Sequence, residues 1–310
     1  MDKYADIIFP HLGITIDNLG KGINVFGYTI AFYGMIIALG MILGYLIVVW
    51  QAKRTGQDDK NYLDLALWCI IFAIIGARLY YVVFSWDYYS KNPSEIMNIR
   101  GGGLAIYGGI IAGVITVLIF SKIKKLSFME VLDTACAGLL VGQILGRWGN
   151  FFNREAFGGY TDNVFAMMIK KSDVSTAYLS ENILNHIVEK DSVAYIQVHP
   201  TFLYESCINI IILIIILLLT KKKKFDGMLL DIYLFGYGLS RFFIEGLRTD
   251  QLKLFGTKIA VSQVVSLIIV AIGLVHFIYN MANLKKSGVK DKAKSDKEAK
   301  ALEKDSEDED

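Results

Sequence analysis

Residues 25–50 read VFGYTIAFYGMIIALGMILGYLIVVW, an apolar run without one charged side chain. A bilayer core needs about 20 apolar residues per helix, so this run predicts a transmembrane helix from Val25 to Trp50. Six further windows meet the same test: Tyr62 to Phe84, Leu104 to Phe120, Phe128 to Trp148, Thr201 to Thr220, Gly227 to Ile244 and Ile259 to Asn280. The sequence therefore predicts an all-α polytopic integral membrane protein with seven transmembrane helices.

Composition agrees with a membrane class. Of the 310 residues, 54% are hydrophobic and 20% are charged, which is too apolar for a soluble domain of this length. The net charge of +2 hides short charged clusters between apolar runs, and no nucleic-acid partner is expected. Cys69, Cys136 and Cys207 each lie in an apolar run without metal-site or disulfide spacing. They are interpreted as small buried hydrophobes.

The positions of Lys and Arg in the connecting segments predict the orientation. Three short links are dense in positive charge: Lys53, Arg54 and Lys60; Lys122, Lys124 and Lys125; and Lys221 to Lys224. They alternate with sparser links, so we expect the N-terminus outside the cell and the C-terminus in the cytoplasm.

Two segments stand apart from the seven helices. Residues 158–198 form the only long link between predicted helices and are expected to be a small head on the outer face. From Leu284 the chain is nearly all Lys, Asp, Glu, Ser and Ala, which cannot bury a core. We therefore divide the chain into a membrane domain, 1–283, and a disordered charged cytoplasmic tail, 284–310.

Charged residues inside apolar spans cost at least about 2.5 kcal/mol each at the bilayer centre, so they need compensation or a purpose. Tyr237, Arg241 and Glu245 are spaced by four and share one helix face, with Arg248 three residues beyond. An Arg–Glu pair that only offsets its own burial is one interpretation. Arg78 and Arg147 also lie toward the outer side, so these arginines have no matching number of carboxylates. That excess favours a bound phosphate, which in a membrane means a phospholipid headgroup.

Further polar clusters fall at outer ends of the predicted spans. The segment 146–158 reads GRWGNFFNREAFG and is interpreted as an anion-holding turn, in which Asn150, Asn153 and Glu155 surround Arg147. The segment 101–109, GGGLAIYGG, places Tyr107 in flexible backbone, and the segment 199–205, HPTFLYE, opens the fifth span. An anion or phospholipid transporter could also use such residues, but the inverted repeats typical of transporters are not evident.

At these residues the sequence resembles the prolipoprotein diacylglyceryl transferases, up to about Asn280. The resemblance implies a seven-helix enzyme of the bacterial cell (inner) membrane with its active site toward the outer face. Such an enzyme transfers the diacylglyceryl group of phosphatidylglycerol to the thiol of the lipobox cysteine of a preprolipoprotein. It forms a thioether and releases glycerol phosphate, with no metal or organic cofactor.

The resemblance also implies roles for single residues, transferred position by position. The residues expected in catalysis are Arg147, Arg241, Tyr107, Glu245 and Tyr237. Those expected to bind phosphatidylglycerol are Arg147, Asn150, Asn153, Glu155, Gly158, Tyr33, Arg78 and Arg248. The sequence departs from the family at Tyr107, where many relatives have His. The proton acceptor therefore stays open between a thiolate held by arginine charge and a relay through Glu245 or Tyr237.

Overall fold

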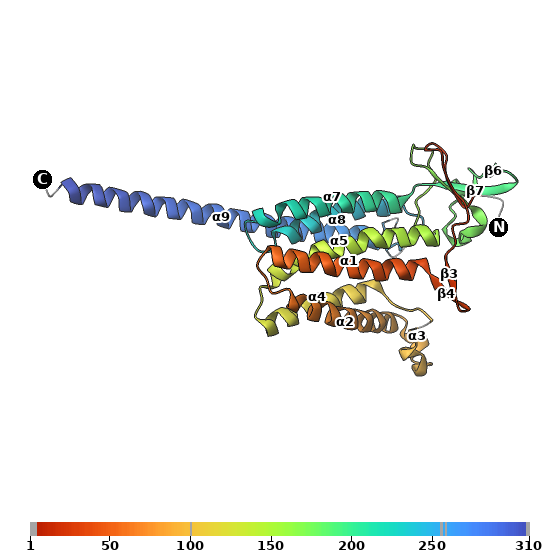
Figure 1. Ribbon diagram of the computed structural model, residues 1–310, viewed down its shortest axis with the longest axis horizontal. Helices are drawn as coiled ribbons and strands as arrows, with labels where there is room; N and C mark the ends of the chain where they lie inside the picture. The colour runs from red at the N-terminus through yellow and green to blue at the C-terminus, as the bar shows by residue number, and fades with distance from the viewer. Residues whose placement is uncertain (1–4, 100, 255–256, 258, 308–310) are drawn as a thin grey trace.

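The computed structural model describes residues 5–99, 101–254, 257 and 259–307, with side chains described up to residue 286. Long helices lie side by side, a small β-sheet covers one end of them, and the last helix extends beyond the opposite end (Figure 1). The long helices are α1 (Phe32–Arg54), α2 (Lys60–Phe84), α4 (Ile106–Lys124), α5 (Phe128–Asn153), α7 (Thr201–Leu219), α8 (Met228–Leu247) and α9 (Val261–Glu307). Short helical turns connect them: α3 (Trp86–Tyr89), η1 (Pro93–Met97), η2 (Lys171–Asp173), η3 (Thr176–Tyr178), α6 (Glu181–Leu184) and η4 (Thr220–Lys222).

The protein is a multi-pass membrane protein. Within the part of the chain that the structure describes, six helices are long and apolar enough to cross a bilayer, namely all the long ones except α8. α8 has 20 residues but carries Asp231, Arg241 and Glu245. The sequence predicted seven spans. α8 counts as the seventh only if these three charged residues lie inside the bilayer.

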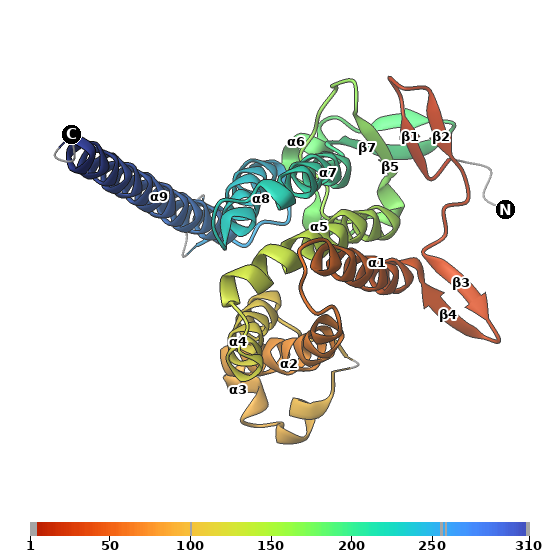
Figure 2. The same cartoon turned by 60° about the vertical axis from the view of Figure 1, so that its left-hand side comes forward.

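Small residues allow the helices to approach closely. α1 crosses α5 where a Cβ on Gly44 would lie only 2.9 Å from the carbonyl oxygen of Gly138. α2 crosses α4 in the same way at Gly76 and Gly108. The paired helices α2 and α4 lie on one side of α1 and α5, and α7 and α8 lie on the other (Figure 2). Close packing through small residues is how helices associate in lipid, where the hydrophobic effect gives no driving force.

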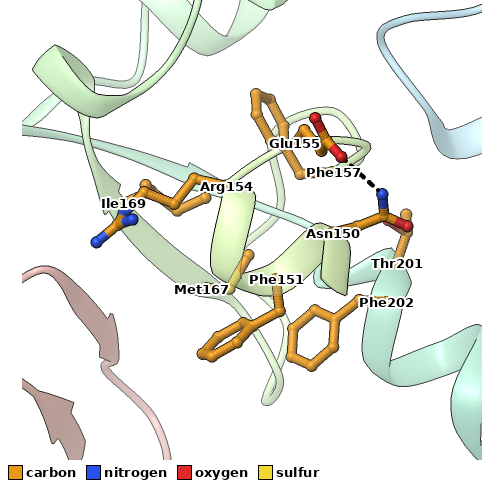
Figure 3. A pocket seen from close by; sticks show the side chains of 9 residues that line it. All are labelled: Asn150, Phe151, Arg154, Glu155, Phe157, Met167, Ile169, Thr201 and Phe202. Carbon is orange, nitrogen blue, oxygen red and sulfur yellow. Dashed lines mark hydrogen bonds between the residues drawn. The ribbon is translucent and has the colours of Figure 1, made fainter. Parts of the chain in front are cut away.

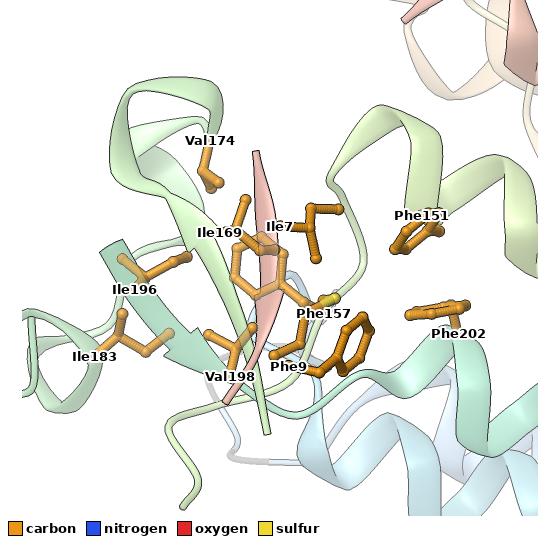
Figure 4. Close-up of a cluster of buried hydrophobic side chains, with 11 residues drawn as sticks. Ile7, Phe9, Phe151, Phe157, Ile169, Val174, Ile183, Ile196, Val198 and Phe202 are labelled. Carbon is orange, nitrogen blue, oxygen red and sulfur yellow. The ribbon is translucent and has the colours of Figure 1, made fainter. Parts of the chain in front are cut away.

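The prediction of an all-α fold is incomplete, because a five-stranded antiparallel sheet lies at one end of the bundle. Its strand order is β2-β1-β5-β7-β6. The strands are β1 (Ile7–Phe9), β2 (Ile14–Ile16), β5 (Met167–Lys170), β6 (Val188–Lys190) and β7 (Val193–Val198). The segment 158–198 is thus completed by the N-terminal residues: Ile7 pairs with Ile169 and is fully buried. Apolar side chains from both segments meet Phe151 and Phe202 of α5 and α7 (Figure 4).

The first helix begins later than predicted. Residues 22–31 form a separate hairpin of β3 (Gly22–Val25) and β4 (Tyr28–Ala31), and α1 starts at Phe32. The hairpin turns at Phe26 and Gly27, both with positive φ (50° and 83°), as a two-residue hairpin turn requires. Apolar composition alone does not distinguish an apolar hairpin from the first turns of a helix, which explains the error.

The predicted tail, residues 284–310, follows the last membrane helix as part of α9 up to Glu307. α9 continues as a helix to Glu307, past the end of the bundle (Figure 1). The tail is rich in Ala, Lys and Glu, which are strong helix formers, so a polar segment without a core can still form a helix. Residues 308–310 of the predicted tail lie outside the described residues.

Candidate active site

A buried carboxylate joins three helices near the sheet end of the bundle. Glu205 lies in the second turn of α7, and its side chain is 1% exposed. Its Oε1 lies 2.9 Å from Nη2 of Arg147 on α5, and its Oε2 lies 3.1 Å from Nη1 of Arg241 on α8. One acid therefore holds two guanidinium groups that are far apart in the sequence.

The predicted polar stripe on α8 extends this network. Arg241 uses Nη2 to pair with Glu245, one turn further along the same helix. Beyond the helix end, Arg248 makes a bidentate contact with Asp250, with Nε–Oδ1 and Nη2–Oδ2 distances of 2.9 and 2.7 Å. Burial alone would raise the pKa of Asp250, but the hydrogen bonds and charge of Arg248 outweigh it and hold this pKa below its usual value. Arg248 also lies 3.7 Å from Glu245, so charges of alternating sign run along this end of α8.

On the other side, Arg147 connects to the amide cluster of the 146–158 segment. Its Nη1 donates to Asn150 Oδ1 at 3.3 Å, and Asn150 in turn donates to Glu155 Oε1 at 2.9 Å. Asn153 donates to the same carboxylate oxygen at 3.3 Å. The three predicted neighbours of Arg147 are thus assembled into one chain of hydrogen bonds that ends on Glu155.

The segment that holds these residues is not the turn that the sequence suggested. α5 stays helical to Asn153, and the chain leaves the helix only at Arg154, which has left-handed backbone (φ 55°). Gly149 is tolerated in the helix because the ring of Tyr33 occupies the space of its missing side chain: a Cβ there would lie 2.8 Å from Tyr33 Cδ2. The glycine therefore serves close packing between α5 and α1.

Three tyrosines lie around the arginines. Tyr237 on α8 lies within electrostatic range of Arg147 and Arg241 and stacks on Tyr233, with ring centroids 5.5 Å apart. Tyr107, in the first turn of α4, lies within electrostatic range of Glu245 and Arg241. Tyr33, second residue of α1, is 37% exposed above Gly149. The structure thus brings the starts of α1 and α4 to the same end as the two arginines.

Gly158 acts through packing rather than through a side chain. It forms a β-bridge with Arg248, and its amide donates to the carbonyl of His199 at 3.0 Å. A Cβ on Gly158 would lie 2.7 Å from that of His199, so only glycine fits where the head segment meets the beginning of α7 and the end of α8. Beside it, nine residues line a cavity of about 10 Å³ (Figure 3), which accommodates one water molecule and no lipid headgroup.

Arg78 is the predicted ligand that lies apart from this network. Its five N–H groups all donate to backbone carbonyls, those of Glu95, Ile96, Asn98, Gly102 and Gly103, at 2.6–3.0 Å. A guanidinium has five donors, so none remains for a phosphate. Arg78 instead holds together the loop between α2 and α4, which carries the glycine-rich segment to Tyr107.

The sequence argument that arginines outnumber carboxylates is wrong for this site. Arg147, Arg241 and Arg248 are matched by Glu205, Glu245 and Asp250. Glu205 was not among the predicted site residues, although a carboxylate inside the most apolar span was a signal that could have identified it.

A fourth arginine, Arg154, is 6% exposed. It pairs with Asp6 and Asp173 at 3.5 and 3.1 Å. Both partners belong to the segments that form the five-stranded sheet, so Arg154 links this sheet to the end of α5. Among the described residues, no group of three or more His, Cys, Asp or Glu side chains is placed to hold a metal ion.

Comparisons with known proteins identify the family of this chain. Residues 22–279 match the family described as prolipoprotein diacylglyceryl transferase. A phosphatidylglycerol–prolipoprotein diacylglyceryl transferase of Finegoldia magna is 43% identical over 253 residues, 81% of this chain and 92% of the relative. Proteins of the same name from Clostridioides difficile and Clostridium novyi are each 41% identical, over 83% and 87% of this chain and 93% and 96% of the relatives. The chain therefore belongs to the prolipoprotein diacylglyceryl transferase family.

Proposed function

We propose that this protein transfers the diacylglyceryl group of phosphatidylglycerol to the thiol of the lipobox cysteine of preprolipoproteins. The observation that carries the proposal is the Arg147–Glu205–Arg241 chain of ion pairs, built into the bundle of a member of this family. A lipid headgroup is the anion that a membrane supplies at this depth, and planar guanidinium groups bind phosphate well.

The proposed placement puts the sheet end on the outer face of the bacterial cell (inner) membrane. The links between α1 and α2, α4 and α5, and α7 and α8 carry the positive clusters, and all lie at the end opposite the sheet (Figure 1). Cytoplasmic links are rich in Lys and Arg, which supports an outer head, an outer N-terminus and a cytoplasmic C-terminus. In this arrangement α8 is the seventh span, and its charged outer turn lies among other helices.

The bond changes of the proposed reaction define what the site must do. The sulfur of the lipobox cysteine attacks the glycerol carbon that bears the phosphate, so a C–S bond forms and the C–O bond breaks. The electron pair of that bond stays on the phosphate oxygen, and glycerol phosphate departs. The thiol loses its proton. The site must therefore stabilise charge developing on the leaving phosphate and accept or displace a proton.

Arg147 and Arg241 suit the first task. Within the described chain, the hydrogen-bond and ion-pair partners of Arg147 are Asn150 and Glu205, and those of Arg241 are Glu205 and Glu245. Since each guanidinium has five N–H donors, both keep donors for phosphate oxygens. Their side chains are 19% and 16% exposed, so the site is sheltered yet reachable. Glu205 fixes the two forks in place before substrate binds.

The other predicted residues take roles that follow from their positions. Asn150, Asn153 and Glu155 orient Arg147, and Arg248 with Asp250 borders the site at the end of α8. Gly158 and Arg78 position backbone rather than touching lipid. For the proton, Tyr107, Tyr237 and Glu245 remain candidates, because all three lie beside the guanidinium groups.

The alternative of an anion or phospholipid transporter is not favoured, because the relatives that match most of the chain are named as transferases. A network that only offsets its own burial is the remaining interpretation of the ion pairs. It would leave transfer unaffected when the fork of either arginine is lost in a folded protein.

Mass spectrometry tests the proposal directly. Purified protein in phosphatidylglycerol vesicles is incubated with a lipobox peptide and with the same peptide carrying Ser in place of Cys. A gain of one diacylglyceryl unit on the Cys peptide alone is expected. No gain on either peptide, with correctly folded protein, contradicts the proposal, and equal gains on both exclude a thiol-specific transfer.

A further inference from the structure

The β3–β4 hairpin that precedes α1 has one apolar and one polar face. Ile23 pairs with Ile30, and Val25 pairs with Tyr28. Directly paired residues, and residues two apart on a strand, share a face of a sheet, so these four side chains form one continuous apolar face. The intervening pair on the other face is polar: Thr29 donates to Asn24 at 2.6 Å.

No other part of the described chain covers the apolar face. All four side chains are exposed, from 37% for Val25 to 79% for Tyr28. None belongs to the buried apolar clusters of the described residues. The hairpin forms its own sheet and projects away from the five-stranded sheet (Figure 2). An isolated two-stranded hairpin is marginal in water, so an ordered hairpin of this kind needs a covering surface.

Phe26, in the turn between β3 and β4, also indicates that the hairpin contacts an apolar surface. Phe26 is 97% exposed and holds φ at 50°, a conformation that is disfavoured for a bulky aromatic residue. Asn or Gly is the usual residue at such a turn position. A fully exposed phenylalanine there contributes nothing to the folding of this chain in water, and its side chain is suited to an apolar environment outside the protein.

The connection to α1 identifies that environment. β4 ends at Ala31 and α1 begins at Phe32 without a linker. α1 has 23 residues, which gives a length of about 34 Å against a hydrocarbon core of about 30 Å. If α1 spans the bilayer, the hairpin lies at the outer boundary between lipid and water, where aromatic side chains such as Tyr are favourable.

We propose that the β3–β4 hairpin is a membrane anchor that lies in the outer interface, with Val25, Phe26, Tyr28 and the paired isoleucines in contact with lipid and Asn24 and Thr29 facing water. The anchor fixes the depth and rotation of the start of α1. Tyr33 is two residues beyond β4 and packs on Gly149 of α5. The anchor therefore also determines the position of this tyrosine beside the site.

Neighbouring residues on opposite faces provide a matched test. p-Azidophenylalanine is placed at Tyr28 or at Thr29 and coupled to an environment-sensitive fluorophore, which leaves all cysteines unchanged. Each protein is incorporated into vesicles that contain lipids with a nitroxide high on the acyl chain. We expect quenching at position 28 to exceed that at position 29 by at least about two-fold, at any ratio of protein to lipid.

Three results would overturn the anchor. Equal and weak quenching at both positions means that the hairpin stands in water. Quenching at position 28 that is weak in protein-rich vesicles and rises on diluting the protein in lipid means that a second copy covers the face. Loss of quenching when a lipobox peptide is added means that the face docks the peptide substrate. None of these readouts depends on transfer, so the anchor and the proposed activity are tested separately.

Discussion

Oε1 of Glu205 lies 2.9 Å from Nη2 of Arg147, and this contact joins α7 to α5 in the interior of the bundle. The second oxygen of the same carboxylate contacts Arg241 on α8. An anion that is 1% exposed is costly to bury, and here two cations offset that cost. Glu205 thus determines both the distance and the mutual orientation of the two guanidinium groups.

Glu205→Gln should therefore impair transfer strongly. The neutral amide turns N–H donors toward a guanidinium, so one or both forks must move. A charge-assisted hydrogen bond is worth about 1.5–3 kcal/mol, and we expect a transfer rate at least about ten-fold lower per folded molecule.

Asp231→Asn is the matched control for Glu205→Gln. Asp231 is a carboxylate of α8 that is 3% exposed and contacts His276 outside the proposed site. The Asp231→Asn substitution should lower thermal stability while leaving the transfer rate within about two-fold of wild type. Equal losses of activity in both variants would assign Glu205 a purely structural role.

Arg241→Lys tests whether charge alone is sufficient. Arg241 reaches Glu205 with one terminal nitrogen and Glu245 with the other. A lysine has a single nitrogen and cannot span both acids while also holding a phosphate. We expect folded protein with transfer reduced by at least about ten-fold, measured under single-turnover conditions in phosphatidylglycerol vesicles. If Arg241→Lys shows wild-type kinetics, Arg147 alone must bind the phosphate.

Arg78→Gln should behave differently from the site arginines. The five donated hydrogen bonds of Arg78 hold the loop that ends at Gly103, so their loss should destabilise the protein by about 3 kcal/mol or more. The KM for phosphatidylglycerol, determined on the folded fraction, should stay close to that of wild type. A raised KM with unchanged thermal stability would show instead that Arg78 binds the headgroup.

The topology is tested by labelling cysteines introduced at Ser172, in η2 of the head, and at Ser287, in α9. The three native cysteines are replaced by Ala in both proteins, and that background is the control. In intact cells a membrane-impermeant maleimide should label position 172, and it should label position 287 only after permeabilisation. Labelling of both from outside would exclude the proposed orientation.

The sequence predicted the membrane class and most helices well, because an apolar run of sufficient length has few other interpretations. Thr201–Leu219 and Met228–Leu247 lie within three residues of their predicted bounds. The hairpin at 22–31 and the N-terminal strands were missed, since short apolar segments do not reveal their period. Pairing between Ile7 and Ile169 is a contact over a long sequence distance that no local pattern encodes.

The site was predicted in part. The α8 stripe follows from helical spacing, and Tyr237, Arg241 and Glu245 do lie on one face. The partner of both arginines, Glu205, comes from another helix, and only the packing of α5, α7 and α8 brings it there. For Arg78 the sequence reveals a charge inside a span but not its partners: all five donors reach backbone carbonyls of the loop that follows α2.

An isotope experiment tests most directly that this site breaks the bond between glycerol carbon and phosphate oxygen. Phosphatidylglycerol is labelled with ¹⁸O at the oxygen that bridges the diacylglyceryl carbon and phosphorus, and is incubated with the protein and a lipobox peptide. Both products are then weighed by mass spectrometry. We expect a diacylglyceryl thioether on the peptide and ¹⁸O in the released glycerol phosphate. Unlabelled glycerol phosphate, with the label left on free diacylglycerol and an unmodified peptide, would mean attack at phosphorus and would contradict it.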